Sequence, residues 1–192
     1  ARSFVGALPA KDNLAVMTFD DRPVLRQDFG TDRDASLAAI DKYQAVGGTA
    51  LYDALFESLT RLRSVQGRRV IVVLTDGRDE NNPGTAPGST HTLPQVEALL
   101  KDVGAMVFGI ALGTNVDKVS IERVTQASGG EAYYPHDVSL LAGEYRRVLD
   151  NLRTGYRKNL DGLNHTFIEG SVTDRELVKK AVEGVDYIFH MA

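Results

Sequence analysis

The chain has 192 residues, which is enough for one α/β domain, alone or with an appendage. Its net charge of −4 and its scattered acidic residues argue against nucleic-acid binding, and no apolar stretch approaches the roughly 20 residues of a membrane span. The lack of cysteine excludes disulfides, zinc-thiolate sites and thiol catalysis.

Strand and helix signals alternate along the first four fifths of the chain. Short apolar runs predict strands, and apolar residues at helical spacing predict helices. In chain order the predicted elements are strands at 14–19 and 24–29, helices at 35–45 and 51–67, a strand at 69–75, a helix at 94–103, a strand at 105–112, a helix at 118–128, a strand at 131–135 and a helix at 139–156.

The character of the sequence changes after residue 156. Residues 157–164 are polar and turn-rich, which predicts a junction. A strand is predicted at 165–172, a helix at 174–183 and a strongly apolar strand at 185–192. The predicted organisation is therefore an α/β domain over 1–156, a junction over 157–164 and a β-α-β segment over 165–192.

Strands that alternate with helices of ten or more residues predict right-handed crossovers. The expected fold class is α/β, a three-layer α/β/α architecture with a mostly parallel, doubly wound, Rossmann-like sheet of six to eight strands. Ligands of such sheets bind beyond the carboxyl ends of the strands. The loops after Phe19, Thr75 and Leu112 are therefore the candidate binding loops.

Four stretches of residues 1–156 resemble the von Willebrand factor A family. These are DNLAVMTF at 12–19, GGTALYDAL at 47–55, VVLTDG at 72–77 and VFGIALG at 107–113. Residues 1–8 are similar to the end of the family's first helix, so the resemblance implies a domain that lacks the family's first strand. It also implies a protein-binding function, through a metal ion that a carboxylate of the partner protein completes.

The resemblance assigns two residues to that metal site, Thr49 and Asp76. The family's other three ligands come from an Asp-x-Ser-x-Ser motif, which this sequence does not contain. Because Mg²⁺ prefers about six oxygen ligands, we expect an incomplete site with weak Mg²⁺ binding at most. The alternatives are that Thr49 caps the helix at 51–67, that Asp76 is a turn residue, and that Asp20 and Asp21 form a turn.

Residues 163–192 resemble a β-α-β piece of extended short-chain dehydrogenases, in particular nucleotide-sugar epimerases. FIEGSVTD at 167–174 and LVKKAVEGVDYIFHMA at 177–192 carry this similarity. The glycine-rich phosphate loop and the Tyr-x-x-x-Lys pair are missing, and Ser171 stands where the family usually has an adenine-contacting Asp, so dinucleotide binding is not expected. Two unrelated resemblances indicate a chimera made by recombination or design.

Deletion of a central strand would open a slot in the sheet, and residues 185–192 are predicted to fill it, with the helix at 174–183 covering the sheet. His190 would then reach the ligand end, most simply as a buried neutral side chain. His91 and His136 are expected to lie in loops without partners at metal-ligand spacing, and Ser89 is too close to His91 in sequence to indicate a triad.

The leading function hypothesis is a non-enzymatic chimeric scaffold that retains no native activity. The alternatives are a metal-dependent protein-binding module that uses Thr49 and Asp76, and an NAD-binding epimerase fragment. No cofactor is expected apart from weakly bound Mg²⁺, and neither nucleic acid nor membrane is an expected partner. A homodimer through an exposed sheet edge stays open, and the sequence does not indicate a compartment.

Overall fold

The computed structural model describes residues 2–44, 46–75, 78–113 and 116–154, together with Glu176 and Lys179. The chain divides into two units, Ala1–Gly155 and Tyr156–Ala192, and every element below belongs to the first. In the second unit, Glu176 and Lys179 are helical and exposed. Asp76, His190, the junction 157–164 and the predicted strands at 165–172 and 185–192 lie outside the described residues.

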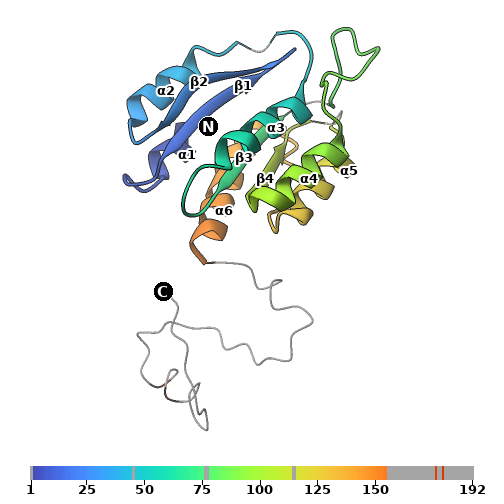
Figure 1. Cartoon of the computed structure of the whole chain (residues 1–192). Coiled ribbons are helices and arrows are strands. Elements are labelled where there is room, and N and C mark those ends of the chain that lie inside the picture. Colours follow the sequence, from blue (N-terminus) through green and yellow to red (C-terminus); the bar gives the residue numbers. More distant parts are fainter. Residues whose placement is uncertain are drawn as a thin grey trace. The chain divides into compact units, whose positions relative to one another are not determined.

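Helices and strands alternate through the first unit (Figure 1). In chain order they are α1 (Arg2–Ala7), β1 (Leu14–Phe19), β2 (Pro23–Gly30), α2 (Arg33–Asp41), α3 (Leu51–Leu62), β3 (Val70–Thr75), α4 (Leu93–Val103), β4 (Met106–Ala111), α5 (Lys118–Ala127), β5 (Ala132–Tyr133), the 3₁₀ turn Val138–Leu140 and α6 (Leu141–Thr154).

Local chemistry accounts for the ends of these helices. The Asp32 carboxylate accepts a hydrogen bond from the Ala35 N–H (2.9 Å) and so caps α2. Thr92 and Gln95 form a capping box at the start of α4. The same helix ends at Gly104, whose φ of 65° lies in the left-handed region that glycine enters without strain.

The described strands form two sheets. β1 and β2 pair antiparallel, and β3, β4 and β5 form a parallel sheet in that order. The prediction of a single sheet of six to eight strands is therefore not met within the described residues, where β1 and β3 do not pair. The physical reason is that main-chain pairing needs adjacent strands, and no described strand lies between β1 and β3.

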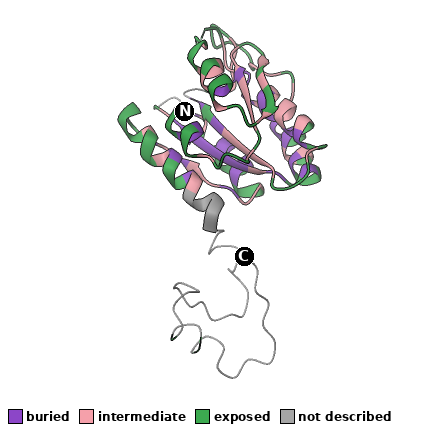
Figure 2. Ribbon diagram, turned by 90° about the vertical axis from the view of Figure 1, so that its left-hand side faces the viewer, coloured by how far each residue is buried: buried purple, intermediate pink, exposed green. Residues whose placement is uncertain are grey.

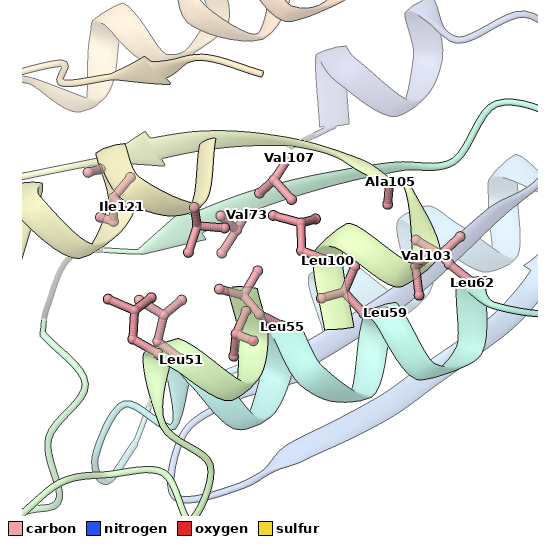
Figure 3. Close-up of a cluster of buried hydrophobic side chains, with 14 of the residues drawn as sticks. Leu51, Leu55, Leu59, Leu62, Val73, Leu100, Val103, Ala105, Val107 and Ile121 are labelled. Carbon is pink, nitrogen blue, oxygen red and sulfur yellow. The ribbon is translucent and has the colours of Figure 1, made fainter. Parts of the chain in front are cut away.

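Helices cover both faces of the parallel sheet. On one face α3 packs against α4 and α4 against α5, while on the other α1 contacts α6 (Figure 3). Figure 3 shows Leu55, Leu59 and Leu100 gathered beneath Val73, in the layer between the helices and the strands. Figure 2 shows the resulting pattern, with buried residues inside and exposed helix surfaces outside. The fold class predicted from the sequence, a three-layer Rossmann-like α/β fold, is confirmed.

Four predicted elements differ from the structure by more than one residue at an end. The helix predicted at 51–67 ends at Leu62. The helix predicted at 35–45 spans Arg33–Asp41, the strand predicted at 131–135 is reduced to Ala132–Tyr133, and the helix predicted at 139–156 starts with a 3₁₀ turn. Among the described residues, none of the helices has both the length and the apolar character needed to cross a bilayer.

Candidate binding site around Thr49

The loops that follow β1 and β3 meet at the segment that leads into α3. The Ala50 N–H donates to the Asp20 carbonyl, and the Gly48 N–H donates to the Asp21 carboxylate, each over 2.7 Å. The Thr49 N–H donates to the Glu80 carbonyl, also over 2.7 Å. The carboxyl ends of β1 and β3 therefore lie at the same end of the domain. We call residues 20–21, 47–50, 78–82 and 86–91 the Thr49 loop cluster.

Two glycines allow these loops to approach each other. A Cβ on Gly48 would lie 2.7 Å from the Glu80 carbonyl oxygen, and a Cβ on Gly88 would lie 2.5 Å from the Thr49 carbonyl oxygen. Real Cβ atoms do not approach main-chain atoms this closely. Both positions therefore need a residue without a side chain, and the main chain around Thr49 is fixed by close packing as well as by hydrogen bonds.

The first amides of α3 are satisfied by the loop that precedes α4. The Tyr52 N–H donates to the Asp79 carboxylate (3.1 Å), and the Asp53 N–H donates to the Ser89 hydroxyl (2.9 Å). The N-cap residue is Ala50, so the alternative prediction that the Thr49 hydroxyl caps this helix is wrong. The Thr49 hydroxyl makes no hydrogen bond to any described residue.

Asp53 anchors the loop before α4 to the first turn of α3. Its carboxylate accepts from the main-chain N–H groups of Thr90 (2.9 Å) and His91 (2.8 Å), and its Oδ1 lies 2.6 Å from His91 Nδ1. The His91 ring stacks on Phe56, with 3.8 Å between the ring centroids. Partial burial opposes the ionisation of Asp53, but the hydrogen bonds from Thr90 and His91 outweigh it and lower the pKa of this carboxyl.

Asp53→Asn tests this anchor. Because the pKa of Asp53 is lowered in the folded state, its carboxylate stabilises the fold above the ordinary pKa of 3.8, and this contribution is lost as the pH falls further. We expect the variant to lower the free energy of unfolding by about 1 kcal/mol at pH 7 and by less at pH 3. Urea unfolding at both pH values measures the difference.

Glu57→Gln is the matched control, since Glu57 is a carboxylate on the same helix that forms an exposed i,i+4 pair with Arg61 (2.7 Å). We expect its effect to stay below roughly 0.5 kcal/mol. An Asp53→Asn effect that is no larger than this, or that does not change with pH, would contradict the anchoring role.

The residues that the sequence analysis named as candidates have different roles in the structure. Asp21 binds the Gly48 amide and so does more than form a turn, while the carbonyl of Asp20 binds the Ala50 amide. His136 is exposed, whereas His91 contacts Asp53, a pairing that the sequence analysis did not anticipate. No sequence signal pointed to this pair, because the two residues are 38 positions apart.

The described residues of the cluster do not by themselves form a complete metal site, and Asp76 lies outside them. The carboxylates of Asp21, Asp53 and Asp79 each accept main-chain N–H groups, which occupies them as structural acceptors. Within residues 2–44, 46–75, 78–113 and 116–154, no group of three or more His, Asp or Glu side chains is placed to hold a metal. The hydroxyl of Thr49 is one neutral ligand, far fewer than the six oxygens that Mg²⁺ prefers.

Comparisons with known proteins agree with this architecture. Residues 1–78 match the model of the von Willebrand factor type A domain family. The chain is 26% identical over 159 residues to the UPF0353 proteins of Mycobacterium ulcerans (strain Agy99) and Mycobacterium marinum (strain ATCC BAA-535 / M). The match covers 69% of this chain and 46% of each relative, so the chain spans about half the length of these proteins.

Solved structures show the same fold at low sequence identity. The von Willebrand factor type A protein from Catenulispora acidiphila superposes with a TM-score of 0.61 at 17% identity, covering 76% of this chain and 35% of that one. Protein BatB from Bacteroides thetaiotaomicron gives 0.62 at 12% identity, covering 79% and 84%. Proximal thread matrix protein 1 from mussel byssus, with a zinc-occupied MIDAS motif, gives 0.58 at 20% identity, covering 77% and 38%.

The similarity of residues 163–192 to epimerases finds no support in these comparisons. The same holds for a chimeric or designed origin, since the matched relatives are natural proteins. The solved structures show that the chain has a von Willebrand factor A-like α/β fold. The match to the family model covers residues 1–78.

Proposed function

We propose that this domain is a non-enzymatic protein-binding module whose contact surface is the Thr49 loop cluster. One observation supports the proposal: Asp79 and Ser89 satisfy the first amides of α3, so the Thr49 hydroxyl is not needed as the cap of this helix. Ligands of parallel α/β sheets bind at this end. The zinc-occupied MIDAS motif of the mussel protein supports a ligand role for the same region.

The absence of catalysis is part of the proposal. The Ser89 hydroxyl donates to the Asp79 carboxylate (2.5 Å), whereas His91 Nδ1 is directed to Asp53. Ser89 and His91 are thus held by different carboxylates, and no hydrogen bond between them is among the described contacts. Nucleophilic catalysis by serine needs a base within hydrogen-bonding distance of the hydroxyl, and the described geometry of Ser89 does not supply one.

An inert scaffold is the alternative function, favoured by the shortage of metal ligands among the described residues. The two functions differ in what they predict for a divalent cation. A binding module that uses Thr49 and Asp76 should attract Mg²⁺ weakly, with a partner carboxylate needed to complete the shell. An inert scaffold should show no site-specific response to Mg²⁺.

A Mg²⁺ titration of the full chain, followed by amide NMR, separates them. We expect weak, saturable shifts confined to Gly48–Leu51 and the start of the loop after β3, which Thr49→Ala abolishes. Thr60→Ala, on the exposed part of α3, is the matched control and should keep the response. The opposite result would be well-dispersed spectra of the wild type and Thr60→Ala in which no amide shifts when Mg²⁺ is added. That result would overturn the proposal in favour of the inert scaffold.

A further inference from the structure

A pocket lies between helix α2 and strand β2, outside the Thr49 loop cluster. Figure 1 shows α2 lying along the small β1–β2 sheet, and the helix contacts both strands. The pocket has a volume of about 320 Å³, within the range of about 300–1,000 Å³ that is usual for small-molecule sites. We call it the α2 pocket, and its lining residues are Arg26, Ala35, Ala38, Ala39, Lys42 and Tyr43.

The sequence of α2 leaves room for this pocket. Ala35, Ala38, Ala39 and Lys42 are spaced i, i+3, i+4 and i+7, which places them on one face of the helix. Alanine is too short to fill the space between a helix and a strand. Ser36, in contrast, is fully buried, and its hydroxyl donates to the Asp32 carbonyl (2.9 Å). The alanine face of α2 therefore borders an open space that solvent reaches.

Hydrogen bonds to β1 fix the other wall of the α2 pocket. Arg26 Nε donates to the hydroxyl of Thr18 (2.8 Å), which is buried. The Tyr43 hydroxyl donates to the Phe19 carbonyl (3.0 Å). Because the guanidinium is planar and is held through Nε, its direction is set before a ligand arrives. A group that is fixed in advance loses less entropy on binding, so this wall is preorganised for a ligand.

The two cations of the α2 pocket have no anionic partner among the described residues. Arg26 and Lys42 form no ion pair there, and none of the described residues that line the pocket is acidic. The Asp41 carboxylate, next to Lys42, pairs with Arg2 (2.8 Å). The Asp28 carboxylate accepts the main-chain N–H of the next residue (2.8 Å). The pocket therefore carries two positive charges that a bound anion would neutralise.

We propose that the α2 pocket binds a small organic dianion. One acidic group of the ligand pairs with the Arg26 guanidinium, which matches the planar shape of a carboxylate, and the second pairs with the Lys42 ammonium. The short apolar body that joins them lies against the alanine methyl groups and the Tyr43 ring. Two cations on different elements favour a ligand with two anionic groups, and the apolar wall favours a hydrocarbon link over an inorganic ion.

Ligand titrations of the full chain, followed by amide NMR, test the proposal. Succinate is the probe, succinamide is its neutral analogue, and inorganic phosphate is the anion without an apolar body. We expect saturable shifts at Arg26 and at residues 35–43 with succinate and none with succinamide. Succinate should bind about tenfold more tightly than phosphate, because it buries two additional CH₂ groups. Equal binding of phosphate and succinate, or no saturable response to succinate, would overturn the proposal.

Lys42→Gln tests the charge of the pocket. Lys42 is exposed, so the variant should fold, and we expect it to weaken succinate binding roughly fivefold. Lys101→Gln is the matched control, since Lys101 is an exposed lysine in the last turn of α4, as Lys42 is at the end of α2. The control should bind succinate as the wild type does. Equal weakening in the two variants would assign the response to general charge attraction and contradict the site.

Ala38→Leu tests the shape of the pocket without changing its charge. The larger side chain would occupy the space that the ligand needs, so we expect succinate binding to weaken at least about tenfold. Ala98→Leu makes the same change at an exposed position of α4 and should leave binding unchanged. If Ala38→Leu bound succinate as well as Ala98→Leu does, the ligand would not lie in the α2 pocket and the proposal would be wrong.

Discussion

Leu59→Ala is expected to lower the free energy of unfolding by about 2–5 kcal/mol. Leu59 is fully buried at the centre of α3, where it belongs to the core shared by α3, α4, β3 and β4. Removing its side chain loses transfer free energy and leaves a cavity that close-packed neighbours fill only in part. Chemical denaturation followed by circular dichroism measures the change.

Val119→Ala is the matched control for this core substitution. Val119 is an apolar residue on α5, but it is 68% exposed, so we expect an effect within about 0.5 kcal/mol. Equal effects of the two substitutions would show that the α3 face is not the centre of the core, and would contradict the architecture described above.

Gly48→Ala is expected to destabilise the domain by about 1–3 kcal/mol and to loosen the Thr49 loop cluster. The new Cβ would lie 2.7 Å from the Glu80 carbonyl oxygen and 2.9 Å from the Asn81 Cα. Both are main-chain atoms, so relief requires the loop after β3 to move, and the hydrogen bond from the Thr49 N–H to Glu80 would weaken with it. Thermal unfolding and the exchange rate of the Thr49 amide report these two effects.

Gly143→Ala controls for the general effect of replacing glycine. Gly143 lies in α6 with nothing within 4 Å of its Cβ direction, so alanine should stabilise the helix by roughly 0.5–1 kcal/mol. If Gly48→Ala were as stable as the wild type and kept a slowly exchanging Thr49 amide, the close packing of the cluster would be wrong.

Periodicity predicted the elements well because it depends on residues that are near each other in sequence. The apolar stripe of α3 places Leu51, Leu55 and Leu59 on one face, and all three are buried. The continuous apolar run of β3 predicted a strand covered on both faces. The strand is present, but its first three residues are half-buried and Leu74 is exposed, because burial depends on neighbouring elements that composition does not reveal.

The details of the site depend on contacts between distant segments, and sequence patterns did not predict them. A Thr just before a helix is a good local candidate for an N-cap. Here the helix amides are taken by Asp79 and Ser89, which lie more than 25 positions further along the chain. The contact between Asp53 and His91 was not predicted for the same reason, since these residues are 38 positions apart in the sequence. What the family resemblance did predict is that Thr49 lies at the carboxyl ends of the strands.

The central claim is that the Thr49 hydroxyl is a binding group and not a helix cap. Crystals of the full chain soaked in Mn²⁺ and measured for anomalous scattering test it most directly. We expect a peak in contact with Thr49 Oγ1, with Asp79 and Ser89 still accepting hydrogen bonds from the first amides of α3. A Thr49 hydroxyl bonded to the α3 amides, with no peak beside it, would contradict the account and identify the domain as an inert scaffold.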